Sequence, residues 1–181
     1  TSKISRSDEL LDLRSLGFRG EALASIGSVT DLTITSKTSA TEYGFSVSNT
    51  AADKTTTSPA THPLGTTVEA RNLFVRIPAR RRFLKQARTE YSHISQLLRQ
   101  FSFCFPATGF QLISDGKTVL PAEPITSSGT QFDLQARRWR TVFGKEFISE
   151  AVPVGLGTDG VTVSGLLGGV GYSRPKADIQ Y

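Results

Sequence analysis

The sequence lacks several residue types that would restrict what the chain can do. It contains no methionine and a single cysteine, Cys104, so a disulfide within the chain is excluded. Cys104 lies among phenylalanines in residues 101–105, a setting that predicts a buried and inert thiol. The two histidines, His62 and His93, are far apart in the sequence, so we expect no zinc or other metal site.

Long apolar runs are also absent. No stretch approaches the roughly 20 residues that a membrane-spanning helix needs, and no signal peptide opens the sequence. Hydrophobic residues make up 38% and charged residues 20%, which is typical of a folded globular protein. The net charge of +5 favours anionic partners without specifying nucleic acid. Because the sequence begins at Thr1 and stops at Tyr181 inside an expected strand, we expect a piece of a longer protein.

The first half of the sequence predicts a mixture of helices and strands. Leucines at helical spacing predict a short helix in residues 5–16, and a second helix starts near Glu21. Residues 49–63 are rich in Thr, Ser, Ala and Pro and predict a mobile surface loop. Alternating apolar residues predict strands in 31–36, 43–47 and 66–74.

A long helix is expected over residues 78–103, opened by Pro78 in its first turn. Its buried stripe would consist of Phe83, Ala87, Tyr91, Ile94, Leu98 and Phe101. A β-hairpin should follow in residues 110–120, with its tight turn at Asp115-Gly116.

The second half of the sequence differs from the first in composition. Residues 121–129 are the best linker candidate, because they hold two prolines, a glycine and several Ser and Thr residues. Beyond the linker the sequence predicts a helix in 132–145 and strands in 161–167 and 179–181. The string 155–160 matches a dinucleotide-binding glycine pattern, but an alternating strand follows it where that motif needs a helix, so we interpret it as a hairpin turn.

The most informative motif is the heptapeptide in residues 17–23, Gly-Phe-Arg-Gly-Glu-Ala-Leu. A glycine-rich turn that enters a helix gathers unpaired N–H groups and the positive end of the helix dipole, which together favour a phosphate. Arg19 would add a planar charged donor at the same place. The alternative is an ordinary turn, since glycine is the default residue for positive φ.

The motif and its continuation closely resemble the signature of the MutL-type DNA mismatch-repair proteins. The resemblance rests on residues 17–26, Gly-Phe-Arg-Gly-Glu-Ala-Leu-Ala-Ser-Ile, and on the Thr-Ser-Lys-Ile that opens the chain. It extends to Phe74 and Pro78-Ala79-Arg80-Arg81, with Arg76-Ile77-Pro78 where the family usually has Asn-Thr-Pro or Asn-Val-Pro. The residues of the motif argue against a related ATPase such as a topoisomerase subunit.

The resemblance implies an α+β fold in two parts. Residues 1–122 would be the C-terminal part of a Bergerat-type ATPase α/β sandwich, and residues 130–181 the start of a ribosomal-S5-like transducer domain. It also implies a set of nucleotide contacts, which are Thr1, Ser2, Lys3, Gly17, Phe18, Arg19, Gly20, Glu21, Ala22, Leu23 and Thr66.

In the family, ATP hydrolysis uses a glutamate base, a magnesium-binding asparagine and an adenine-binding motif that precede the Thr-Ser-Lys stretch. The resemblance therefore implies ATP and Mg²⁺ in a longer parent protein and no catalytic residue within this sequence. We expect the chain alone neither to hydrolyse ATP nor to bind it tightly, because phosphoryl transfer needs a positioned nucleophile and a metal.

A basic cluster covers residues 71–88, with seven basic and no acidic side chains. One interpretation is a surface that tracks the DNA backbone; the other is a solvated helix face. The candidate DNA contacts are Arg76, Arg80, Arg81, Arg82 and Lys85.

By resemblance, the parent protein would be a bacterial, cytoplasmic and nucleoid-associated mismatch-repair ATPase with no membrane partner. ATP binding would close a homodimer, which would signal from a mismatch-recognition protein to a downstream nuclease or helicase on DNA. The alternative is a non-catalytic DNA-binding or protein-interaction module on the same scaffold.

Overall fold

The structure is a computed structural model that describes residues 4, 6, 16–17, 19–49, 55–126 and 128–173. The chain divides into two compact units, Thr1–Leu84 and Lys85–Tyr181. The predicted helix in residues 5–16 lies almost entirely outside the described residues, and the predicted strand in 179–181 lies wholly outside them.

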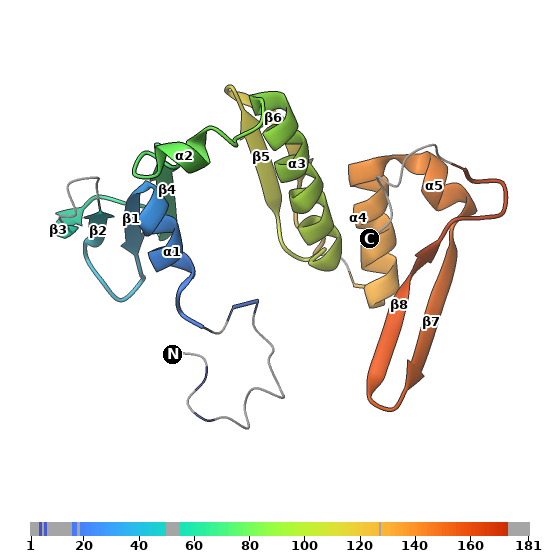
Figure 1. Cartoon of the computed structure of the whole chain (residues 1–181). Helices are drawn as coiled ribbons and strands as arrows, with labels where there is room; N and C mark the ends of the chain where they lie inside the picture. Colours follow the sequence, from blue (N-terminus) through green and yellow to red (C-terminus); the bar gives the residue numbers. More distant parts are fainter. Residues whose placement is uncertain are drawn as a thin grey trace. The chain divides into compact units, whose positions relative to one another are not determined.

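The first unit is built around a four-stranded antiparallel sheet in the order β3-β2-β1-β4 (Figure 1). Helix α1, Ala22–Val29, precedes the sheet and contacts β1. The strands are β1 (Asp31–Lys37), β2 (Gly44–Asn49), β3 (Thr55–Ala60) and β4 (Gly65–Arg71). The predictions of a helix near residue 21 and of strands in 31–36, 43–47 and 66–74 are confirmed in type, with small shifts in their ends.

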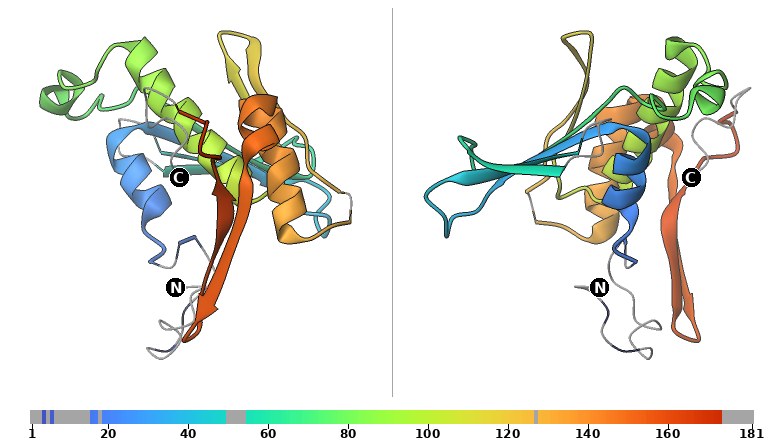
Figure 2. Two further views of the ribbon diagram at one scale, coloured as in Figure 1. Left: turned by 90° about the vertical axis from the view of Figure 1, so that its right-hand side faces the viewer. Right: turned by 60° about the vertical axis from the view of Figure 1, so that its left-hand side comes forward.

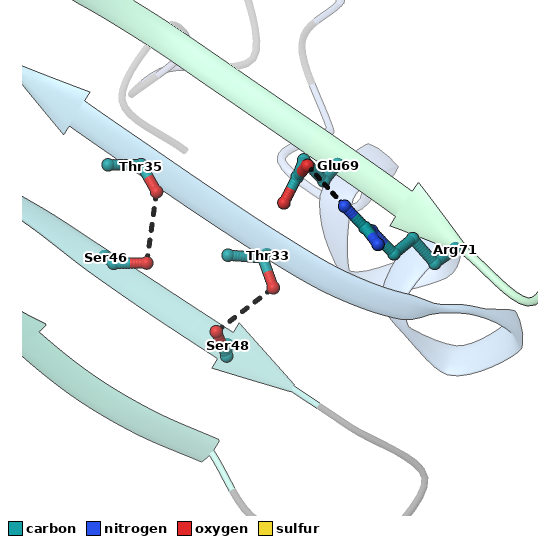
Figure 3. Close-up of polar contacts among 6 residues, drawn as sticks. All are labelled: Thr33, Thr35, Ser46, Ser48, Glu69 and Arg71. Carbon is teal, nitrogen blue, oxygen red and sulfur yellow. Dashed lines mark hydrogen bonds and ion pairs between the residues drawn. The ribbon is translucent and has the colours of Figure 1, made fainter. Parts of the chain in front are cut away.

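The two faces of this sheet differ in polarity because side chains alternate along each strand. Leu32 and Ile34 of β1 pair with Ala70 and Val68 of β4, which makes one face apolar. On the other face Thr33 bonds to Ser48 and Thr35 to Ser46, each with an oxygen–oxygen distance of 3.1 Å (Figure 3). The apolar face carries α1, and the hydroxyl-rich face is the solvent side expected of an antiparallel sheet.

The expectation of a loop throughout residues 49–63 is wrong. Residues 55–60 form β3, which pairs with β2 from Asn49↔Thr55 to Gly44↔Ala60. The segment has few apolar anchors, but its threonines are β-branched and favour the extended backbone of a strand. Pro59 is compatible with this assignment because β3 lies at the edge of the sheet.

The expectation of one helix over residues 78–103 is also wrong. Pro78–Arg81 form the four-residue helix α2, and Ala87–Cys104 form the separate helix α3. The Glu90 carboxylate accepts a hydrogen bond from the Lys85 N–H at 3.1 Å, which caps a new helix instead of extending the first.

The predicted buried stripe is only partly correct. Tyr91, Leu98 and Phe101 are half-buried, whereas Ala87 is exposed and Phe83 and Ile94 have exposed fractions of 84% and 55%. The packed side of α3 instead includes Ser102, which is fully buried, and Arg99, whose Nη1 donates to the Val142 carbonyl at 3.0 Å. Cys104 is exposed at the last position of α3, so the expectation of a buried thiol is wrong as well.

The second unit packs α3 against α4, Gln131–Phe143, and the two helices lie side by side in Figures 1 and 2. The unit also contains the predicted hairpin β5–β6, Phe110–Ser114 and Lys117–Ala122, the short helix α5, Lys145–Glu150, and a second hairpin. The Trp139 ring lies at its centre, 5.1 Å from the Phe103 ring and 4.5 Å from the Phe147 ring between centroids.

Helix α4 confirms the helix predicted in 132–145 and begins at a complete capping box. The Asp133 N–H donates to Thr130 Oγ1 at 3.2 Å, and the Thr130 N–H donates to Asp133 Oδ2 at 2.9 Å. These bonds from the Thr130 side chain and backbone lower the pKa of Asp133 below its ordinary value of 3.8. The helix ends at Gly144, whose φ of 94° lies in the region that favours glycine.

The second hairpin consists of β7, Val152–Thr158, and β8, Val161–Leu167. Its tight turn holds Asp159 and Gly160, with φ values of 49° and 79°. The glycine pattern in residues 155–160 is therefore a strand and its turn, which confirms the rejection of a dinucleotide motif. Within the described residues, no helix is long and apolar enough to cross a bilayer.

Candidate phosphate-binding site

The candidate site begins at the exposed N-terminal end of α1. The Ser25 N–H donates to the Glu21 carbonyl at 2.8 Å, which closes the first turn of the helix. The amides of Ala22, Leu23 and Ala24 precede that bond, and helix geometry leaves such amides without an intrahelical acceptor. The Glu21 side chain makes no capping hydrogen bond, and residues 19–26 are all exposed. The end of α1 is therefore an accessible group of N–H donors at the positive end of the helix dipole.

The turn that leads into α1 depends on a glycine. Gly20 has a φ of 74°, a left-handed conformation that L side chains rarely adopt. Gly17 and Arg19 are also exposed, close to this turn in the sequence. The structure thus brings Gly20, Glu21, Ala22 and Leu23 to one helix end, as the heptapeptide predicted.

Thr66 lies on the same face of the sheet as α1. It pairs with Ser36, and its Oγ1 lies 2.8 Å from Ser36 Oγ. Ser36 shares a face of β1 with Leu32, whose Cδ2 lies 3.3 Å from an ideal Cβ position on Gly27 of α1. Thr67 points to the opposite face, where its hydroxyl contacts His62 Nε2 at 2.7 Å.

The C-terminal end of α1 is tied to residues 72–77, the connection between β4 and α2. Arg76 Nη1 donates to the Gly27 carbonyl at 2.8 Å, and the Phe74 N–H donates to the Val29 carbonyl at 2.7 Å. Cationic side chains are favoured at a helix C-terminus, where carbonyls lack partners. Arg76 is half-buried and directed at α1. We therefore leave it out of the residues proposed to contact DNA.

The remaining candidate DNA contacts are exposed. Arg80 lies over the Phe74 ring, with Cζ 5.1 Å from the ring centroid. Arg81 and Arg82 are exposed in and after α2, and Lys85 is exposed in the second unit. Arg71, within the same basic cluster, pairs with Glu69 at 3.0 Å on the polar face of the sheet (Figure 3).

Other predicted nucleotide contacts lie outside the described residues: Thr1, Ser2, Lys3 and Phe18. In the part of the chain that the structure describes, no group of three or more His, Cys, Asp or Glu residues could hold a metal ion.

One residue with a structural role was missed by sequence reasoning. Arg138 of α4 is only 1% exposed, and its Nη2 donates to the carbonyls of Pro106 and Thr108 at 2.6 and 2.8 Å. Burial lowers the pKa of this guanidinium, with Glu123 acting in the opposite direction. Nothing in the sequence distinguishes Arg138 from Arg137 and Arg140, because the three arginines together resemble a cluster of solvated charges.

Comparison with known proteins agrees with the motif, although no family model matches the chain. The DNA mismatch repair protein MutL of Pseudomonas entomophila is 40% identical over 182 residues and that of Coxiella burnetii 36% identical over 181. Each alignment covers the whole chain, and the chain spans 28% and 31% of the length of these relatives.

Solved structures of the same family share the fold. The Aquifex aeolicus MutL ATPase domain complexed with ADP is 26% identical, covers 84% of this chain and 56% of its own, and has a TM-score of 0.64. A second structure of the Aquifex aeolicus ATPase domain, 22% identical with a TM-score of 0.62, covers 95% of this chain and 58% of its own. The α+β fold is thus that of a MutL ATPase domain, and the chain belongs to the MutL family of DNA mismatch repair proteins.

Proposed function

We propose that the N-terminal end of α1 holds phosphate groups of an adenine nucleotide. The observation that carries this proposal is the set of exposed amides at Ala22, Leu23 and Ala24, which follow the left-handed Gly20. Oriented N–H groups at a helix N-terminus bind anions through hydrogen bonds and through the helix dipole. Arg19 supplies a cationic donor beside them.

The identity of the nucleotide follows from the family. The Aquifex aeolicus ATPase domain that this chain resembles is complexed with ADP. We therefore assign the site to ATP and its product ADP, with Thr66 on the α1 side of the sheet and Thr1, Ser2 and Lys3 as lid contacts. In the longer protein Mg²⁺ would accompany ATP, and hydrolysis would use residues outside this sequence.

The proposed role of the longer protein is that of a mismatch-repair switch. ATP would close a homodimer, and the closed dimer would connect a mismatch-recognition protein to a nuclease or helicase on DNA in the bacterial cytoplasm. Residues 1–122 would serve as the ATPase part and residues 130–181 as the start of a transducer domain. Arg80, Arg81, Arg82 and Lys85 would contact the DNA backbone.

Titration with ADP, followed by amide NMR of the whole chain, tests the phosphate site. We expect weak, saturable shifts at Ala22, Leu23 and Ala24. Gly20→Ala should weaken this binding by about tenfold, or about 1.4 kcal/mol, because the turn can no longer present the amides without strain. Gly155→Ala is the matched control, since Gly155 needs no positive φ and a Cβ there meets no neighbour. Shifts confined to residues 71–88 would contradict the proposal.

The second candidate function is a non-catalytic DNA-binding module on this scaffold. It is favoured by the exposed arginines 81 and 82, which belong to a stretch without acidic residues. In that case short duplex DNA, but not ADP, would shift amides, and the shifts would centre on residues 80–85. The same titration series therefore separates the two functions.

A further inference from the structure

The last turn of α1 is held by bonds from outside the helix. The carbonyls of Ile26, Gly27 and Val29 belong to the last four residues of α1, which have no intrahelical donors. Thr30 Oγ1 donates to Ile26 at 2.8 Å, Arg76 Nη1 to Gly27 at 2.8 Å and the Phe74 N–H to Val29 at 2.7 Å. Two of these three donors come from residues 72–77, so this connection fixes the end of the helix.

The same end of α1 also lies close to the sheet. An ideal Cβ on Gly27 would lie 3.3 Å from Leu32 Cδ2 and 3.6 Å from Asn49 Nδ2. Because the helix has only eight residues, it is about 12 Å long at 1.5 Å per residue. In so short a helix, we expect a displacement at the N-terminal end to reach the carbonyls at the C-terminal end.

Residues 72–77 are in turn a fixed connection. Asn72 and Phe74 have φ values of 55° and 60°, which are unusual for residues other than glycine. The Asn72 amide donates to Asp31 Oδ2 at 2.7 Å, and the Val75 and Ile77 N–H groups donate to the Asn72 and Phe74 carbonyls. A strained backbone with this many bonds has few alternative arrangements, so it moves as one piece.

This piece leads directly into the basic residues. The Arg80 guanidinium lies over the Phe74 ring, and the Arg80 N–H donates to the Ile77 carbonyl at 2.9 Å. A continuous set of contacts thus runs from α1 through Arg76 and Phe74 to α2. Arg76 is the member of this set whose charged side chain bonds to α1.

We propose that Arg76 is a positioning residue that couples phosphate binding at the N-terminal end of α1 to the orientation of the basic segment, residues 80–82. The inference rests on the proposed phosphate site and adds a regulatory connection to it. Arg76 acts through α1 and touches no nucleotide. Its half-buried hydrogen bond to Gly27 is stronger than an exposed one, because competing water is reduced.

The coupling is tested by amide NMR of the whole chain with inorganic tripolyphosphate as the probe. In the unaltered chain, shifts at Ala22–Ala24 should be accompanied by shifts at Phe74 and Arg80 with the same concentration dependence. In Arg76→Ala the shifts at the helix end should persist, while those at Phe74 and Arg80 fall by at least about threefold, because the coupling is lost. Arg76→Lys, which keeps a charged donor, should restore them.

Arg71→Ala is the matched control, because it removes an arginine of the same unit that lies outside the candidate DNA contacts and pairs with Glu69 on the polar face of the sheet. It should leave the paired response unchanged. If Arg76→Ala fails to fold, the contrast between Arg76→Lys and Arg76→Gln decides, since only the lysine retains the charge that favours the helix end.

The outcomes separate this inference from the proposed function. Shifts at Ala22–Ala24 without any response at Phe74 and Arg80, or an unchanged response in Arg76→Ala, would overturn the coupling and leave the phosphate site standing. The absence of shifts at Ala22–Ala24 in the unaltered chain would overturn the phosphate site and, with it, the coupling.

Discussion

Arg138 shows how one side chain can hold a loop against a helix. Its guanidinium takes the place of water for the carbonyls of Pro106 and Thr108, which lie between α3 and β5. A buried cation is costly unless it is hydrogen-bonded, and breaking such a contact leaves the remaining groups without partners. The neighbouring Trp139 is 4% exposed and the only tryptophan, so it reports on this region.

We expect Arg138→Met to lower the free energy of unfolding of the second unit by about 2–4 kcal/mol, because the buried Pro106 carbonyl and the part-buried Thr108 carbonyl lose their donor while the aliphatic packing is kept. Urea unfolding followed by Trp139 fluorescence measures the loss. Arg140→Met on the same helix is the control, since Arg140 is exposed and should change stability by no more than about 0.5 kcal/mol. Equal effects of the two variants would contradict the role given to Arg138.

The backbone conformation and the burial of single residues are difficult to predict from the sequence. Gly20 was predicted from its motif, because a positive φ has a compositional signature. Phe74 also has a positive φ, but nothing in its residue type indicates it, since tertiary bonds such as Phe74 to Val29 impose the conformation. The Cys104 thiol was wrongly predicted to be buried for a similar reason, because an apolar stretch does not indicate which side of a helix faces the core.

The capping box at the start of α4 makes a prediction about pH. Bonds from the Thr130 side chain and backbone to the Asp133 carboxylate lower its pKa, which means that the folded state favours the ionised form. This contribution to stability is present above the ordinary value of 3.8 and is lost as the pH falls through the lower pKa of the folded state.

We expect Thr130→Val, which keeps the shape but removes the hydroxyl, to raise the pKa of Asp133 towards 3.8. A carboxyl NMR titration measures the change directly. The control is Thr141→Val on the same helix, which removes a hydroxyl bonded to the Arg137 carbonyl and should leave the pKa of Asp133 unchanged. A pKa of Asp133 that is unchanged in Thr130→Val would show that the hydroxyl bond is not its cause.

The turn of the β5–β6 hairpin is expected to require a glycine at position 116. Gly116 has a φ of 76° and no neighbour that a Cβ would meet, so only backbone strain opposes a side chain there. Gly116→Ala should destabilise the second unit by about 1 kcal/mol. Gly155→Ala in β7 meets equally open space without a positive φ and should be neutral in the same urea experiment. A neutral Gly116→Ala would show that the turn relaxes.

Elements with strong local signals were predictable, and those that depend on distant partners were not. The β5–β6 hairpin and β8 follow from Asp-Gly and alternation, so their predicted ranges match closely. Strand β3 was missed because its stability comes from pairing with β2 and not from apolar residues. The break between α2 and α3 was missed because the bond from Lys85 to Glu90 competes locally with helix continuation.

At the scale of the whole molecule, the family was predictable because one contiguous motif carries it, and the relatives agree along the full chain. The placement of residues 20–23 at one helix end was predictable because these residues are consecutive, so local geometry alone brings them together, while their binding of a nucleotide stays a prediction. The position of Thr66 on the α1 side of the sheet required the register of β1 and β4, which sequence alone did not give.

The two interpretations of the basic cluster differ in how DNA affinity depends on salt. If Arg80, Arg81, Arg82 and Lys85 neutralise phosphates, the affinity of the chain for a short duplex should fall about a hundredfold between 50 and 200 mM salt, with a logarithmic slope of about −3 to −4.

Replacing one of these contacts separates a DNA surface from a general effect of charge. Arg81→Glu should weaken binding and make the slope less steep by about 1, because one fewer counterion is released. Arg140→Glu changes the net charge by the same amount at an exposed position outside the basic cluster, and it should leave the slope unchanged. Fluorescence anisotropy at a series of salt concentrations measures both slopes. Equal slopes in the two variants would mean that the protein's overall positive charge attracts DNA and that arginines 80–82 form only a solvated surface.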